Sequence, residues 1–165
     1  MDNLKKILPI SALILVIVFV GIFEWNIMAS ETTKHFDNGI VTFDYPTNLN
    51  VNVYNNSKLW KLDVNDGWYV SCIIELRDYP YNTSNYTFDK YFKNDYYVGE
   101  VIEANKTTIS GKPAYNLTTK GPGGQIIYGT YIDTGNGIIF IGPYDNGDAA
   151  NYNVYKTIVN SFKIK

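Results

Sequence analysis

The sequence predicts an α+β protein in which an N-terminal transmembrane helix precedes a mainly antiparallel β-sheet covered by helices. Three features of the 165-residue chain lead to this prediction. An uncharged apolar run lies near the N-terminus, turn dipeptides then separate segments of alternating polarity, and two later segments carry apolar residues at helical spacing. Hairpin-length links favour antiparallel strands, and two amphipathic helices would have to cover the sheet.

The N-terminal run, Ile7–Phe23, has the length and polarity of a membrane span. Its 17 residues contain no charge, and as a helix they would span roughly 26 Å of a hydrocarbon core about 30 Å thick. Trp25 suits the membrane interface. Lys5 and Lys6 precede the run and no Lys or Arg follows before Lys34. The positive-inside rule therefore predicts a single-pass protein of the cell membrane, with a cytoplasmic N-terminus and the C-terminal domain outside.

A cleaved signal peptide is the competing interpretation of this run. Signal peptides have an apolar region of about 7–15 residues and a cleavage site of small residues. The run here is longer, and Ile27-Met28-Ala29 matches such a site poorly, which favours an uncleaved signal-anchor. The expected organisation is a cytoplasmic stub and anchor over residues 1–29, a short linker over 30–35 and an extracytoplasmic domain over 36–165.

Turn dipeptides and alternating polarity define the expected strands of that domain. Asn-Gly or Asp-Gly occurs at 38–39, 66–67, 136–137 and 146–147, and both dipeptides suit the positive φ angles of tight hairpins. Trp68, Val70, Cys72, Ile74 and Leu76 alternate with other residues and should form one apolar face. The continuously apolar run 138–141 should be a central strand covered on both faces. The expected strands cover 41–45, 60–64, 68–76, 101–109, 113–119, 125–132 and 138–141.

Two segments have the spacing of amphipathic helices. In 87–97, Phe88, Tyr91 and Phe92 fall at positions i, i+3 and i+4. In 148–162, an apolar stripe is formed by Tyr152, Tyr155, Ile158, Val159 and Phe162, and Asp148 is a good N-cap.

Three motifs of the domain resemble those of the PsbP-like group. They are Asn38–Pro46 at its start, Ile109–Tyr115 in mid-chain and Ile158–Phe162 at its end. The resemblance covers about residues 36–165 and implies an antiparallel sheet with helices on both sides, an α/β/α sandwich. The group usually has a Trp shortly after the first motif, and Leu49 should take its packing place here. The plant members are accessory subunits of photosystem II, but no motif in this chain implies that role.

The composition excludes several functional classes. A net charge of −2 with a single Arg, Arg77, argues against nucleic acid as a partner. The lone Cys72 excludes an internal disulfide framework and a Cys-rich zinc site, and its place on an apolar strand face predicts an inert core thiol. His35 is the only His, and no nucleophile-elbow, zinc-protease or phosphate-loop motif occurs. We therefore expect no catalytic activity and no cofactor.

Three turns could be mistaken for sites. Asp63–Gly67 begins like a calcium loop but lacks the later Glu, and Asp145–Asp148 has only two carboxylates. We expect turn and cap roles for both, with weak metal binding, or a hydrolase using surface carboxylates such as Asp145 with Asp148, as the alternatives. Gly121–Gly124 should be a hairpin turn, because no Lys-Ser/Thr and no helix follow it.

A cluster of tyrosines supplies the candidate ligand contacts. Tyr79, Tyr81 and Tyr86 could stack on a sugar or dock a protein; the alternative is that they decorate a loop. Asn-X-Ser/Thr occurs five times, about twice the chance expectation for this composition, and an Asn-rich composition explains this as well as glycosylation does. The glycosylation candidates are Asn55, Asn82, Asn85, Asn105 and Asn116.

Together these features predict a membrane-anchored extracytoplasmic accessory or binding module without catalytic activity. Its expected partners are the lipid bilayer, through the N-terminal helix, and an envelope protein or glycan. The alternative function is a cell-envelope glycan-binding domain that uses exposed tyrosines.

Overall fold

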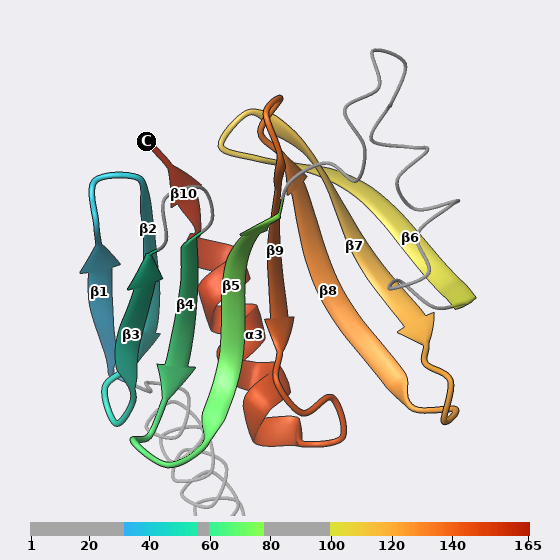
Figure 1. Cartoon of the computed structure of the whole chain (residues 1–165), viewed down its shortest axis with the longest axis horizontal. Helices are drawn as coiled ribbons and strands as arrows, with labels where there is room; N and C mark the ends of the chain where they lie inside the picture. Colours follow the sequence, from blue (N-terminus) through green and yellow to red (C-terminus); the bar gives the residue numbers. More distant parts are fainter. Residues whose placement is uncertain (1–31, 56–59, 78–99) are drawn as a thin grey trace, which may run out of the picture. The chain divides into compact units, whose positions relative to one another are not determined.

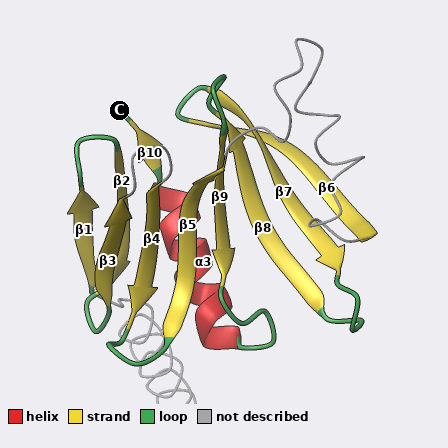
Figure 2. Cartoon of the chain, viewed as in Figure 1, coloured by secondary structure: helices red, strands yellow, loops and turns green. Residues whose placement is uncertain are grey.

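The computed structural model describes residues 32–55, 60–77 and 100–165. These residues form ten β-strands and one α-helix (Figures 1 and 2). The elements are β1 (Thr33–Asp37), β2 (Val41–Pro46), β3 (Asn50–Asn55), β4 (Trp60–Asn65), β5 (Val70–Arg77), β6 (Glu100–Ile109), β7 (Lys112–Lys120), β8 (Ile126–Asp133), β9 (Ile138–Pro143), α3 (Ala149–Ser161) and β10 (Lys163–Ile164).

Seven strands form one antiparallel sheet in the order β3-β4-β5-β9-β8-β7-β6. Two runs of neighbouring strands, β3–β5 and β6–β9, meet where β5 pairs with β9 (Figure 1). In that pairing Ile74 lies opposite Ile141, and both side chains are fully buried. The prediction that 138–141 forms a central strand is confirmed, because β9 has strand neighbours on both sides.

A second, three-stranded sheet joins the start of the described chain to its end, in the order β1-β2-β10. Its hairpin turn uses the predicted Asn-Gly pair: the Asn38 side-chain oxygen accepts a hydrogen bond from Val41 N at 2.9 Å, and Gly39 has a φ of +82°. The C-terminus is held to this hairpin, since Lys165 N donates to the Ile40 carbonyl at 2.9 Å.

Helix α3 lies against β2, β5 and β9. Val154 and Ile158 point into a core that also holds Phe43, Cys72 and Leu49. The helix begins as predicted, because the Asp148 carboxylate caps it by accepting from Ala150 N at 2.8 Å. The predicted helix over 148–162 is thus confirmed with small changes at its ends.

The expected α+β class, with helices covering the sheet as an α/β/α sandwich, is wrong. The described residues are mainly strand, in two antiparallel sheets, and contribute one helix. Part of the excess of strand comes from β1 and β3, which the sequence did not predict. Their residues are mostly exposed, so backbone pairing with a neighbouring strand holds them, together with Phe36 and Val51, which pack against the core.

Two predicted helices lie outside the described residues: the apolar run Ile7–Phe23, expected to be transmembrane, and 87–97. In the three described ranges, no helix is long and apolar enough to cross a membrane. The described fold begins with β1 at Thr33, within the range 30–35 that was expected to be a linker.

Trp68 was expected on the apolar face of β5 and is instead 91% exposed. The strand begins only at Val70. The Asp66 carboxylate accepts hydrogen bonds from Tyr69 N and Trp68 N, each at 2.8 Å, and so draws both residues into the turn. These bonds hold the pKa of the Asp66 carboxyl below its ordinary value. Local turn chemistry therefore overrides the alternation of polarity at this point.

Candidate functional site

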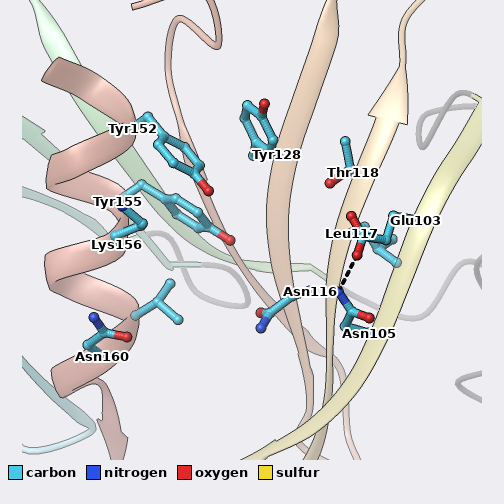
Figure 3. A pocket seen from close by; sticks show the side chains of 11 residues that line it. Glu103, Asn105, Asn116, Leu117, Thr118, Tyr128, Tyr152, Tyr155, Lys156 and Asn160 are labelled. Carbon is cyan, nitrogen blue, oxygen red and sulfur yellow. Dashed lines mark hydrogen bonds between the residues drawn. The ribbon is translucent and has the colours of Figure 1, made fainter. Parts of the chain in front are cut away.

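A cleft of about 340 Å³ opens between helix α3 and strands β6, β7 and β8 (Figure 3). One wall is the helix, and the other is formed by strands β6, β7 and β8 of the large sheet. The lining residues are Glu103, Asn105, Asn116, Leu117, Thr118, Tyr128, Tyr152, Tyr155, Lys156, Val159 and Asn160.

A chain of hydrogen bonds closes the bottom of the cleft. Thr130 Oγ1 donates to Asn116 Oδ1 at 2.8 Å. Because a threonine hydroxyl carries one proton, the Tyr155 hydroxyl, 2.8 Å from Thr130 Oγ1, must be the donor in the second bond. Thr130 is completely buried. Burial raises the pKa of Tyr155 to about 12, above the ordinary tyrosine value of about 10, so its hydroxyl remains a donor well into the alkaline range.

Tyrosines form the helix side of the cleft. The ring centroids of Tyr128 and Tyr152 are 4.6 Å apart with the rings tilted by 47°, and those of Tyr152 and Tyr155 are 5.8 Å apart. Lys156 Nζ lies 5.0 Å from the Tyr152 ring centroid, within the range of a cation–π contact. The Asn146 side chain fixes the strand that carries Tyr128 by accepting from its backbone N at 2.8 Å.

Amides, a carboxylate and a hydroxyl form the sheet side. Asn105 of β6 lies directly opposite Asn116 of β7, and Glu103 lies opposite Thr118. Asn105 Nδ2 donates to Glu103 Oε1 at 2.9 Å. Glu103 and Lys156 are the charged lining residues and have opposite signs, so the lining carries no net charge.

The structure brings two of the predicted glycosylation asparagines together in this cleft, Asn105 and Asn116. Asn116 is half-buried in mid-strand with its side-chain oxygen in a hydrogen bond, whereas Asn105 is exposed. Asn55 is exposed at the end of β3, remote in strand order from both. The other predicted site residues lie outside the described residues: Tyr79, Tyr81, Tyr86, Asn82 and Asn85. Glycosylation stays a prediction for all five asparagines.

The residues considered for nucleophilic or acid–base chemistry lie away from the cleft. His35 is exposed on β1, where its Nδ1 lies 2.7 Å from Asp44 Oδ1. Cys72 is fully buried in the apolar core, and burial raises the pKa of its thiol far above the ordinary value. The prediction that Cys72 is a thiol of the apolar core is confirmed; its lack of reactivity stays a prediction.

The turns at Asp145–Asp148 and Gly121–Gly124 have the local roles predicted for them, whereas Asp63 of the third turn lies buried in β4, with its Oδ1 3.0 Å from Lys61 Nζ. Asp145 Oδ1 accepts from Gly147 N at 2.9 Å, and Asp148 caps the helix. Gly121 N donates to the Gln125 carbonyl at 2.9 Å in the turn between β7 and β8. In the described parts of the chain, no group of three or more His, Cys, Asp or Glu residues could hold a metal ion.

Sequence reasoning missed the cleft. Tyr152, Tyr155 and Val159 were assigned to the apolar stripe of the helix, because they share its spacing with Ile158. Only Tyr155 of these three is buried. The available signal was the amphipathic nature of tyrosine itself, whose ring packs while its hydroxyl reaches a polar partner.

No family model matches the chain, and no curated protein matches it. The resemblance to the PsbP-like group stays a prediction, and the chemistry of the cleft has to be inferred from its own geometry.

Proposed function

We propose that the protein is a membrane-anchored extracytoplasmic binding or accessory module without catalytic activity, and that the cleft beside α3 binds a small polar ligand. The observation that carries this proposal is the composition of the cleft walls. Tyrosines in ring contact with one another face amides and hydroxyls, and such a mixture of aromatic surface with a few oriented polar groups is typical of ligand sites. No His or Cys is among the described lining residues.

A thermal shift assay on the full chain in detergent tests binding in the cleft. The panel contains neutral sugars, amino acids and nucleosides. We expect at least one class to raise the melting temperature, because a ligand that binds only the folded state stabilises it. If no class raises it, binding of a small polar ligand in this cleft is wrong.

The proposed location is supported by the apolar run Ile7–Phe23 and the two lysines before it. Alkaline extraction of membranes and protease treatment of intact cells test this location. The chain should stay in the membrane pellet, and a C-terminal tag should be digested without lysis. A soluble cytoplasmic pool would contradict the anchored topology.

Recognition of envelope glycan is the second candidate function. It is favoured by the Tyr-Pro-Tyr cluster at 79–81 with Tyr86 nearby in sequence. Titration of the full chain with envelope polysaccharide should quench Tyr and Trp fluorescence, and Tyr81→Ala should abolish the response. Quenching that survives in Tyr81→Ala would contradict a role for this cluster.

A further inference from the structure

We infer that the ligand of the cleft is a neutral saccharide, with its hydroxyls bound by Asn105 and Asn116 and its ring packed against the tyrosine wall. This inference rests on the proposed binding function and names the chemical class of the ligand. Three properties of the cleft lead to it: the orientation of the two amides, the aromatic wall and the balance of charge.

The hydrogen-bond chain through Thr130 orients the Asn116 amide. Asn116 Oδ1 is occupied by the Thr130 hydroxyl, which in turn accepts from Tyr155. The amide nitrogen with its two N–H groups is thereby the part of Asn116 left to donate to a ligand. Figure 3 shows the Asn116 side chain and the Tyr155 hydroxyl close to each other across the cleft.

The Asn105 amide has the opposite orientation, because its nitrogen rather than its oxygen is already hydrogen-bonded. Asn105 Nδ2 donates to Glu103 Oε1, which leaves Asn105 Oδ1 as an acceptor. Because Asn105 and Asn116 are directly paired across β6 and β7, their Cβ atoms are about 5 Å apart. The sheet therefore presents a donor beside an acceptor. Neighbouring hydroxyls of a sugar match this pair, since each hydroxyl both donates and accepts.

The tyrosine wall supplies the apolar contact that a sugar ring needs. Tyr128 and Tyr152 are half-buried, and their tilted rings contact each other with centroids 4.6 Å apart. A tyrosine combines flat apolar area with a hydroxyl at its edge, which suits the alternation of C–H and O–H groups on a sugar. The cleft volume of about 340 Å³ is near the lower end of the usual range for small-molecule sites, about 300–1,000 Å³.

The charges of the lining argue against other ligand classes. One Glu and one Lys give no net charge, so neither a phosphorylated ligand nor a cation would be favoured. A lipid chain would leave the amides unsatisfied against hydrocarbon, which is costly. A neutral, hydroxyl-rich molecule can form hydrogen bonds to the amides on one wall and pack against the tyrosine rings on the other.

Isothermal titration of the full chain tests this inference, in a zwitterionic detergent that carries no sugar. The probes are glucose, N-acetylglucosamine and a disaccharide of each, with alanine, glutamate and adenosine as the competing classes. We expect saturable binding of at least one sugar and none of the competing compounds. Asn105→Ala should weaken that binding about two- to tenfold, because it removes a hydrogen bond.

Two control variants should leave sugar binding unchanged. Thr107→Ala removes the glycosylation sequence but keeps the Asn105 amide, so its sugar affinity should be unchanged. Tyr69→Ala removes an exposed tyrosine outside the cleft and should also have no effect. Circular dichroism would verify folding of each variant, and Asn105 is exposed on an edge strand, where substitution is tolerated.

The outcomes separate this inference from the proposed function. If no sugar binds, or if Asn105→Ala binds sugar as well as the wild type does, the saccharide assignment is wrong. If an amino acid or adenosine binds instead and Asn105→Ala weakens it, the cleft is a ligand site but the ligand class is wrong. If nothing in the panel binds, the inference and the proposed role of the cleft both fail.

Discussion

The two halves of the seven-stranded sheet present different kinds of side chain to helix α3. On the half formed by β4, β5 and β9, the side chains toward α3 are apolar and sealed: Leu62, Val64, Cys72, Ile74 and Ile141 are all completely buried. On the half formed by β6, β7 and β8, the corresponding side chains include amides and hydroxyls that line an open cleft (Figure 3). We call these the closed half and the open half.

The comparison shows how one short helix can serve stability and binding at once. Ile158 on one side of α3 is completely buried, whereas its neighbours Val159 and Asn160 line the cleft. Apolar burial on the closed half provides the free energy that keeps the helix in place. The open half can then keep polar side chains such as Asn105 and Lys156 accessible to a ligand.

The largest effect that tests this division should come from Ile158→Ala. Removing a fully buried side chain from the closed half should lower the free energy of unfolding by about 2–5 kcal/mol, because a cavity is left. Urea unfolding followed by circular dichroism measures the change. Val159→Ala, on the cleft side of the same turn, should cost clearly less. Equal losses would mean that the cleft side packs as tightly as the closed half.

The next effect is the response of the open half to alkaline pH. Tyr155 has a folded pKa of about 12, above the ordinary value of about 10. Between these values the unfolded chain loses the proton while the folded chain keeps it, so stability present below pH 10 is lost as pH rises toward 12. The loss attributable to Tyr155 should be roughly 2–3 kcal/mol.

Unfolding of Tyr155→Phe across the same pH range isolates this contribution. Its free energy of unfolding should fall less steeply than that of the wild type between pH 10 and 12. Tyr144→Phe, at an exposed tyrosine, should follow the wild type. If Tyr155→Phe also follows the wild type, the buried hydrogen-bond chain does not control the titration.

A smaller effect should follow from Asp148→Ala, which removes the N-cap of α3 shared by both halves. We expect a loss of about 1 kcal/mol, measured by thermal unfolding. Asp148→Asn keeps a capping oxygen and should recover most of the stability. A similar loss in both variants would point to the charge, rather than the hydrogen bond to Ala150 N, as the stabilising feature.

The smallest effect should come from Asn105→Ala on the open half. Its side chain is exposed and bonds only to Glu103 among the hydrogen bonds of the described residues, so stability should change by less than about 0.5 kcal/mol. Thermal unfolding of the full chain measures it. A loss above about 1 kcal/mol would show that the cleft wall supports the fold, and the contrast between the halves would be weaker.

Prediction from sequence succeeded where local patterns were strong. The strands around Val41, Leu62, Cys72 and Ile139 follow from alternating or continuous apolar runs, and the helix after Asp148 follows from its cap and stripe. It failed at β1, whose residues are mostly polar, and at β3, where the alternation of two valines with asparagines was overlooked. It also failed at Trp68, where the Asp66 turn decides the conformation. The candidate site was missed because its residues come from three strands and a helix that are distant in sequence.

The sequence by itself determined the strands that have an apolar face and the position of α3, because these depend on neighbouring residues. Its near-neutral charge argues against nucleic acid as a partner. Only the tertiary structure decided the fold class of the described residues, the order of the strands and the cleft. Asn105, Asn116 and Tyr155 become a site only through strand pairing and the packing of α3, and long-range pairing leaves no periodic trace in the chain.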